Sequence, residues 1–143
     1  MPEIVTRQFG KIRFDENAVL HFPAGLPGFE TRTRFLLIER PATAPLLFLQ
    51  SLESGNLCFA AAPICSIDAA YNLAMTPEDQ QIVSDSADPL VLAILSAHKS
   101  GKWTANLLAP VVINRETRRA VQAVRADTLY SHVHPLPEVR PCS

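Results

Sequence analysis

Short apolar runs alternate with turn residues along the whole chain. The runs are rich in Val, Ile, Leu and Phe, and they are separated by glycines and by many of the 12 prolines. Runs of this length and composition are typical of β-strands rather than of helices. We therefore expect strands at residues 4–8, 11–14, 18–22, 34–39, 46–53, 57–62, 90–98, 104–114 and 120–126.

The fifth of these runs alternates in polarity. Leu46, Phe48 and Leu52 lie on one face of an extended strand, whereas the other face becomes polar at Ser51 and Glu53. The pattern predicts a strand with one buried face.

Two later runs indicate how the sheet is built. Residues 90–95 are apolar without alternation, which predicts a strand that is covered on both sides. Pro110 has no amide hydrogen to donate, so the run 104–114 must lie at an edge or be bent or bulged there. A curved sheet or an open barrel accommodates such a strand.

One helix start is visible at Thr76-Pro77-Glu78-Asp79. A capping hydroxyl, a proline at the first helical position and two acids at the positive end of the helix dipole favour a short helix there. Three prolines predict that the final nine residues form no packed element. We expect an all-β, mostly antiparallel fold, an open or pseudo-barrel with one or two short helices, in which residues 1–136 form one domain and residues 137–143 a disordered tail.

Composition and charge limit the partners. With 143 residues, of which 48% are hydrophobic and 19% charged, the chain is long enough to bury a core. The net charge of −1 is unlike that of a nucleic-acid binder, so we expect no direct contact with nucleic acid. Residues 41–100 carry one basic group and six acidic ones, which would attract a basic partner if folding gathered them on one face. The six acids are Glu53, Asp68, Glu78, Asp79, Asp85 and Asp88.

Sequence signatures of catalysis are absent. The chain has no G-x-G-x-x-G, no G-x-x-x-x-G-K-[ST], no H-E-x-x-H, no C-x-x-C and no G-x-S-x-G. Of the four histidines only His132 and His134 have a spacing that suits a metal, and the nearest thiol, Cys142, is distant from them. We therefore expect neither an enzyme, nor a metal, nor a cofactor.

The expected location is a reducing cytoplasm. Three cysteines at no recognised spacing, and an amino terminus without a basic and then apolar segment, do not suggest export. The longest apolar stretch, residues 90–95, is far shorter than the roughly 20 residues that cross a bilayer, so we expect no membrane segment.

The densest turn is the segment Phe22–Glu30, in which two prolines and two glycines set a compact loop that presents Leu26 and Phe29. Two roles are open for these side chains. They either close one end of the core or contact a partner. The single tryptophan, Trp103, is interpreted as a structural or partner-anchoring residue because a stacking surface for nucleic acid needs several aromatics.

Several ordered motifs together resemble the family of the flagellar assembly factor FliW. The resemblance covers about residues 4–136 and is weak between residues 64 and 88. The motifs are Thr6-Arg7-Gln8-Phe9-Gly10, the Gly-Leu-Pro-Gly-Phe-Glu core within residues 22–30, Leu49-Gln50-Ser51-Leu52-Glu53, Thr104-Ala105-Asn106-Leu107-Leu108-Ala109-Pro110 followed by Val111-Val112-Ile113-Asn114, Tyr130-Ser131 and His134-Pro135-Leu136.

What the resemblance implies is a barrel-like binding protein without catalysis. In the scheme of that family, the protein antagonises the RNA-binding translational regulator CsrA and also binds flagellin, so that the flagellin level limits flagellin translation. The expected partners are therefore a CsrA-type regulator and flagellin. The residues that we nominate for partner contact are Leu26, Phe29, Glu30, Gln50, Glu53, Asp68, Asn106 and Asn114.

Alternatives remain open at this point. Gln50, Asn106 and Asn114 are polar groups in apolar motifs, so each either satisfies backbone groups or faces a partner. A competing function is a small-ligand or enzymatic barrel that uses a histidine and a carboxylate at its mouth, with His21, His98 and His134 as the candidates. An OB-like nucleic-acid module is disfavoured by the acidic middle of the chain.

Overall fold

A computed structural model describes residues 1–86, 88–127 and 129–136. Short strands dominate it, with one short α-helix and three single 3₁₀ turns among these residues. The strands are β1 (Glu3–Thr6), β2 (Gly10–Arg13), β3 (Leu20–His21), β4 (Arg34–Glu39), β5 (Leu47–Ser51), β6 (Cys58–Pro63), β7 (Leu90–Ala97), β8 (Trp103–Ile113), β9 (Ala120–Gln122) and β10 (His134–Leu136). The helices are α1 (Pro77–Val83), η1 (Glu16–Ala18), η2 (Pro41–Thr43) and η3 (Ile64–Ser66).

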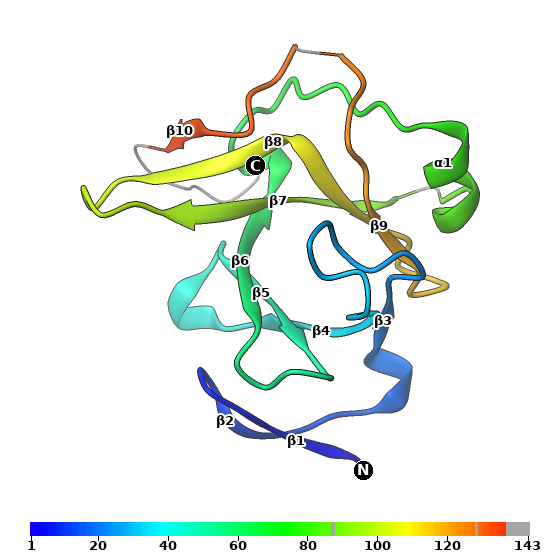
Figure 1. Cartoon of the computed structure of the whole chain (residues 1–143), viewed down its shortest axis with the longest axis vertical. Coiled ribbons are helices and arrows are strands. Elements are labelled where there is room, and N and C mark those ends of the chain that lie inside the picture. Colours follow the sequence, from blue (N-terminus) through cyan, green and yellow to red (C-terminus); the bar gives the residue numbers. More distant parts are fainter. Residues whose placement is uncertain (87, 128, 137–143) are drawn as a thin grey trace.

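Eight strands form one antiparallel sheet that curls almost into a barrel (Figure 1). Their order is β10-β8-β7-β6-β5-β4-β3, and β9 pairs with the far part of β8. The edge strand β3 approaches the turn between β8 and β9, where the amide of His21 donates to the carbonyl of Arg118 at 2.8 Å. This contact brings the two ends of the sheet together. The expected all-β, mostly antiparallel barrel-like fold is confirmed.

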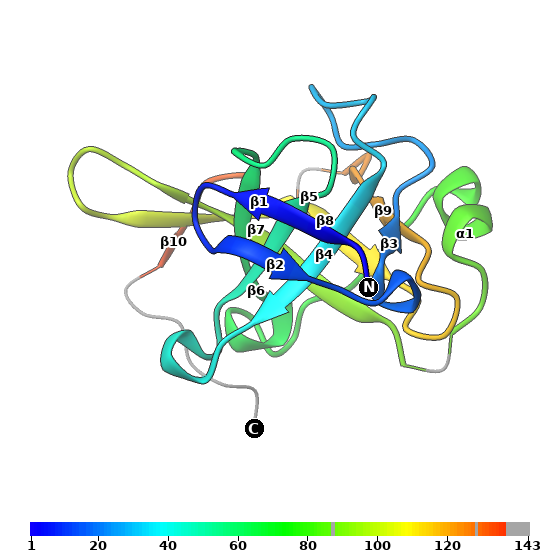
Figure 2. The ribbon, with the colours of Figure 1, turned by 90° about the horizontal axis from the view of Figure 1, so that it is seen from below.

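Apolar side chains fill the barrel and also cover its outer surface. The interior cluster includes Leu20, Phe35, Leu49, Leu92 and Val111, each of which is fully buried. Outside the barrel, the β1–β2 hairpin covers β4 and β5, as Figure 2 shows from below. The helix α1 covers β9 and the nearby part of β8, and the segments around Tyr71 and Tyr130 cover β6, β7 and β8. The outer layers explain why so many strand residues are apolar on both faces.

The local patterns located most elements. Each of the nine expected runs overlaps a strand. The helix begins where the capping residue predicts, because the Thr76 hydroxyl accepts from the amide of Asp79 at 3.1 Å. The strand β7 is covered on both sides, as expected. Pro110 lies in a bulge, because residues 107–110 of β8 are inserted where β7 has only Ala93. These predictions are confirmed.

Two predictions about the strands were wrong. The strand β5 is buried on both faces and not on one, because Leu47 and Leu49 face the barrel interior while Phe48 packs edge-on against Phe9, with ring centroids 5.3 Å apart. The final residues were expected to form no packed element, yet Pro135 and Leu136 belong to β10, which pairs with β8. Pro135 is tolerated there because β10 is an edge strand.

The expected tail, residues 137–143, lies outside the described residues. Among the residues that are described, none of the helices has the length and apolar character needed to cross a membrane.

Candidate protein-binding site

The loop between β3 and β4 is closed by its own backbone. The amide of Phe29 donates to the carbonyl of Leu26 at 2.7 Å, and the amide of Gly25 donates to the carbonyl of Phe22 at 2.8 Å. Gly25 has a φ of +66°, and a Cβ atom there would lie 2.6 Å from the Cα atom of Glu30. Only glycine fits this position without strain, so the sequence sets the path of the loop.

The two apolar side chains of this loop have different environments. Leu26 is only 2% exposed and belongs to the interior cluster, so it closes one end of the barrel. Phe29 is 38% exposed and packs edge-on against Phe59, with ring centroids 5.7 Å apart. Glu30 is exposed, and its carboxylate accepts from the amide of Gly28 at 3.2 Å. Of the two roles considered, Leu26 therefore has the core role. The ring of Phe29 is partly exposed and is accessible to a partner.

The β5–β6 turn is joined to this loop by polar contacts. One carboxylate oxygen of Glu53 accepts from the amides of Thr33 and Arg34, each at 3.0 Å. The Nε atom of Arg32 donates to the hydroxyl of Ser54 at 2.8 Å. We call the surface made by residues 22–33 and 51–57 the loop end. Hydrogen bonds within the loop end hold the side chains of Glu30, Arg32 and Glu53, so it is a rigid surface.

Gln50 supports the loop end from inside. It is fully buried, and its Nε2 atom lies 3.1–3.5 Å from four carbonyl oxygens of the β5–β6 turn. These carbonyls belong to Ser51, Ser54, Gly55 and Leu57. Of the two roles considered for Gln50, the structure shows the internal one, since its side chain does not reach the surface.

Asn106 and Asn114 also form hydrogen bonds inside the fold, and neither residue belongs to the loop end. The side-chain oxygen of Asn106 accepts from the amides of Leu108 and Ala109 at 3.1 and 3.0 Å, which holds the bulge of β8. Asn114 is 2% exposed, and its Nδ2 atom donates to the carbonyl of Val83 at 2.7 Å. Asn114 therefore fastens the end of α1 to the β8–β9 turn.

The structure thus brings five of the eight nominated residues to one end of the barrel and leaves three elsewhere. The five are Leu26, Phe29, Glu30, Gln50 and Glu53. Asp68 follows η3, where its carboxylate accepts from the amide of Ala70 at 3.0 Å. Figure 1 places the β5–β6 turn at the opposite side of the view from α1, which carries Glu78 and Asp79. The six acids of residues 41–100 therefore do not form one face.

A buried arginine cluster escaped the sequence analysis. Arg125 is 6% exposed, and its guanidinium donates twice to Asp127 at 2.8 Å and once to the carbonyl of Asn72. It also lies over the rings of Tyr71 and Tyr130, at 5.5 and 4.8 Å from their centroids. These contacts fasten the two outer segments to each other. An arginine inside an otherwise apolar run is the signal that could have revealed this cluster.

The histidines give no support to the alternative of a catalytic mouth. His98 is hydrogen-bonded to the hydroxyl of Thr104 at 2.8 Å. It lies beside a hollow of about 700 Å³, and none of the described residues that line this hollow carries a carboxylate. His21 is exposed on β3, and His134 of β10 pairs with Ala105 of β8. In the part of the chain that the structure describes, no group of three or more metal-ligating side chains occurs.

The fold and the loop end define a class: small antiparallel β-barrel proteins with a rigid loop that presents an exposed aromatic ring at one end. A comparison with protein-family models matches residues 3–136 to the family described as FliW protein. The chain belongs to the FliW family.

Individual relatives agree with this assignment. A flagellar assembly factor FliW from Syntrophomonas wolfei is 31% identical over 137 residues, which are 94% of this chain and 88% of that protein. The flagellar assembly factor FliW of Bacillus subtilis is 30% identical over 136 residues, or 93% of this chain and 95% of the relative. A crystal structure of the flagellar assembly factor FliW superposes with a TM-score of 0.84 at 29% identity, and the match covers 94% of this chain and 96% of that one.

Proposed function

We propose that this protein is a cytoplasmic, non-enzymatic flagellar assembly factor that works by exchanging protein partners. One partner is a CsrA-type translational regulator, which the protein antagonises, and the other is flagellin. Newly made flagellin competes for the protein and frees the regulator, so that the flagellin level limits flagellin translation. The proposal rests on the family membership, which spans residues 3–136.

The observation that carries the binding role is the exposed ring of Phe29 on a rigid loop. A partly exposed aromatic side chain that is already fixed in place loses little conformational entropy when a partner covers it. The ring of Phe59 beneath it and the closed backbone of the loop supply that fixation. The loop end therefore has the properties of an anchor surface for a protein.

Electrostatic repulsion supplies a way to antagonise an RNA-binding regulator. Acidic side chains placed beside its RNA-binding surface disfavour phosphate there, at a cost that salt screens. The acids to test first are Asp68, Glu78 and Asp79. Asp68 follows η3, Glu78 and Asp79 lie in the first turn of α1, and the carboxylates of all three form no described ion pair. Neutralising all three should weaken regulator binding and the relief of RNA binding, more at low salt than at moderate salt. Unchanged values at both salt concentrations would refute the repulsion mechanism.

The experiment that tests the proposed function is a calorimetric titration of the purified chain with the CsrA-type regulator of the same organism. The titration is repeated after the chain has been saturated with flagellin. We expect stoichiometric binding of the regulator that flagellin abolishes. If neither protein binds, the proposed function is wrong.

A further inference from the structure

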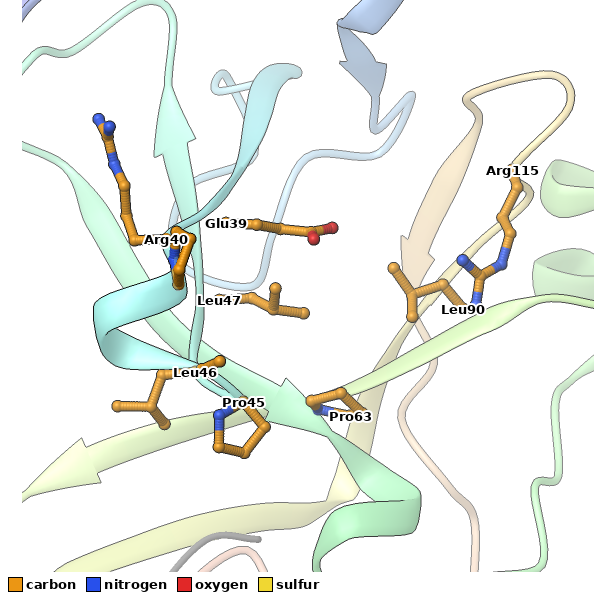
Figure 3. A pocket seen from close by; sticks show the side chains of 10 residues that line it. Glu39, Arg40, Pro45, Leu46, Leu47, Pro63, Leu90 and Arg115 are labelled. Atoms are coloured by element: carbon orange, nitrogen blue, oxygen red, sulfur yellow. The ribbon is translucent and has the colours of Figure 1, made fainter. Parts of the chain in front are cut away.

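The end of the barrel opposite the loop end is open. Here β4 ends, β5 begins, β6 ends and β7 begins, and Figure 3 shows the side chains around the resulting hollow of about 540 Å³. We call this hollow the barrel mouth. Its lining includes Glu39, Leu46, Leu47, Pro63, Leu90 and Arg115.

The floor of the barrel mouth is the end of the core itself. Leu47 is 8% exposed and belongs to the interior cluster, and the half-buried Leu90 packs against that cluster. At the other end of the barrel, the same core is closed by the side chain of Leu26, which is 2% exposed. The side chains of Leu46, Pro63 and Leu90, by contrast, are only half-buried, so the hollow keeps apolar atoms partly exposed. The barrel mouth therefore offers a partly exposed apolar surface. A side chain of the size of leucine can cover this surface, as Leu26 covers the other end of the core.

The charges on the rim are not equivalent. The guanidinium of Arg40 lies 5.4 Å from the ring centroid of Phe9 and points away from the hollow (Figure 3). The Nε atom of Arg115 donates to the carbonyl of Asp88 at 3.0 Å and lies 3.6 Å from its carboxylate. Arg115 is thus paired with Asp88, and Arg40 carries its charge away from the hollow.

Among the described residues, Glu39 is the unpaired rim charge that faces the hollow. Its carboxylate points toward the hollow in Figure 3, and it forms no hydrogen bond or ion pair with any residue that the structure describes. An occupant that places a cation beside the apolar floor gains an ion pair, whereas one that places an anion there faces repulsion.

We propose that the barrel mouth is a docking site for a protein segment that presents a leucine-sized aliphatic side chain next to a lysine or arginine. The aliphatic side chain covers the half-buried Leu90 and Leu46, and the cation pairs with Glu39. This site is separate from the loop end, and the proposal does not depend on which partners bind there.

Blocked tetrapeptides test the proposal directly. The ¹⁵N-labelled chain is titrated with acetyl-Gly-Leu-Lys-Gly-amide, with the same peptide carrying Glu in place of Lys, and with the same peptide carrying Ala in place of Leu. We expect the Leu-Lys peptide to shift the amide signals of Glu39, Leu46, Leu47 and Leu90. The Leu-Glu peptide should bind up to about fivefold more weakly, as one exposed ion pair allows.

Variants locate the effect. Glu39→Gln should remove the preference for Leu-Lys over Leu-Glu, whereas the control Glu16→Gln on η1, whose carboxylate pairs with Arg34 at the other end of β4, should retain it. Both residues are exposed, so the dispersion of the NMR spectrum should show that each variant folds. The proposal is overturned if the Leu-Lys peptide shifts no barrel-mouth amide, if the Leu-Glu or Ala-Lys peptide binds as tightly, or if Glu39→Gln keeps the preference.

Discussion

The substitution Gly25→Ala tests whether the loop end owes its conformation to a single glycine. The φ of Gly25 is +66°, and an added Cβ atom would meet the Cα and carbonyl oxygen of Glu30 at 2.6 Å. Gly10 is a matched control, because its φ is +67° and a Cβ atom there would meet nothing within 4 Å. The two substitutions share the backbone strain and differ in the steric clash.

The expected magnitudes follow from these two contributions. A left-handed backbone costs an alanine about 1–2 kcal/mol, so Gly10→Ala should lower the free energy of unfolding by about that amount. The clash at Gly25 is with backbone atoms that cannot rotate away, and overpacking of this kind costs roughly 1–3 kcal/mol more. We therefore expect Gly25→Ala to lower the free energy of unfolding by about 2–5 kcal/mol in total.

Urea unfolding followed by circular dichroism measures both variants. The slope of the unfolding free energy against urea should stay unchanged, because the surface exposed on unfolding is the same. Partner binding measured on the folded variants should be weakened by Gly25→Ala and retained by Gly10→Ala. Equal losses of stability for the two alanine variants would refute the steric reasoning.

Three further predictions concern buried or partly buried groups. Arg125→Met should lower the free energy of unfolding, measured with urea, by about 2–3 kcal/mol, because the substitution removes the charged hydrogen bonds to Asp127 and Asn72. A loss below about 1 kcal/mol would contradict this prediction. The hydrogen bonds from Arg125 lower the pKa of Asp127 below its ordinary value of 3.8, so its stabilising contribution is present above that pH and is lost as pH falls through the lowered pKa. The difference in melting temperature between the wild type and Asp127→Asn should then be constant above about pH 5 and shrink in more acidic buffer, and a difference independent of pH would speak against this pairing. Burial raises the pKa of the Cys58 thiol to about 11. Its alkylation, followed by mass spectrometry of the Cys58 peptide, should therefore accelerate about tenfold per pH unit between pH 8 and 10, and a rate that levels off near pH 9 would show an unburied thiol.

Elements with a strong local signal could be predicted from the sequence. The strand β4 has the predicted bounds Arg34–Glu39, and α1 begins after the predicted capping residue Thr76. The missing amide hydrogen of Pro110 predicted an edge, a bend or a bulge, and the structure has a bulge there. In each case the residues that determine the element lie within the element or beside it.

Features that depend on distant segments could not be predicted in this way. The second buried face of β5 exists because the β1–β2 hairpin, some 40 residues earlier, covers Phe48 through Phe9. The strand β10 forms because residues 134–136 find a free edge of β8, which no local pattern encodes. Long-range pairing overrides local composition at both places.

The candidate site shows the same division. The two glycines and two prolines of the loop predicted a compact turn, but only the structure distinguishes the buried Leu26 from the exposed Phe29. Gln50 and Asn114 carry hydrogen-bonding groups in apolar motifs, and such a pattern is equally compatible with an internal and an external partner. In the structure both side chains have internal partners, because each donates a hydrogen bond to a backbone carbonyl.

The most direct test of the central claim, that the loop end binds a protein partner, is a calorimetric titration of Phe29→Ala beside Trp103→Ala. The two aromatic side chains are similarly exposed, at 38% and 42%, and lie on different parts of the fold. We predict that Phe29→Ala weakens binding of at least one of the two proposed partners by about tenfold or more, as a hot-spot aromatic does, while its melting temperature stays within a few degrees of the wild type and Trp103→Ala binds normally. Unchanged binding by Phe29→Ala, or a loss of binding that occurs only together with unfolding, would contradict the claim.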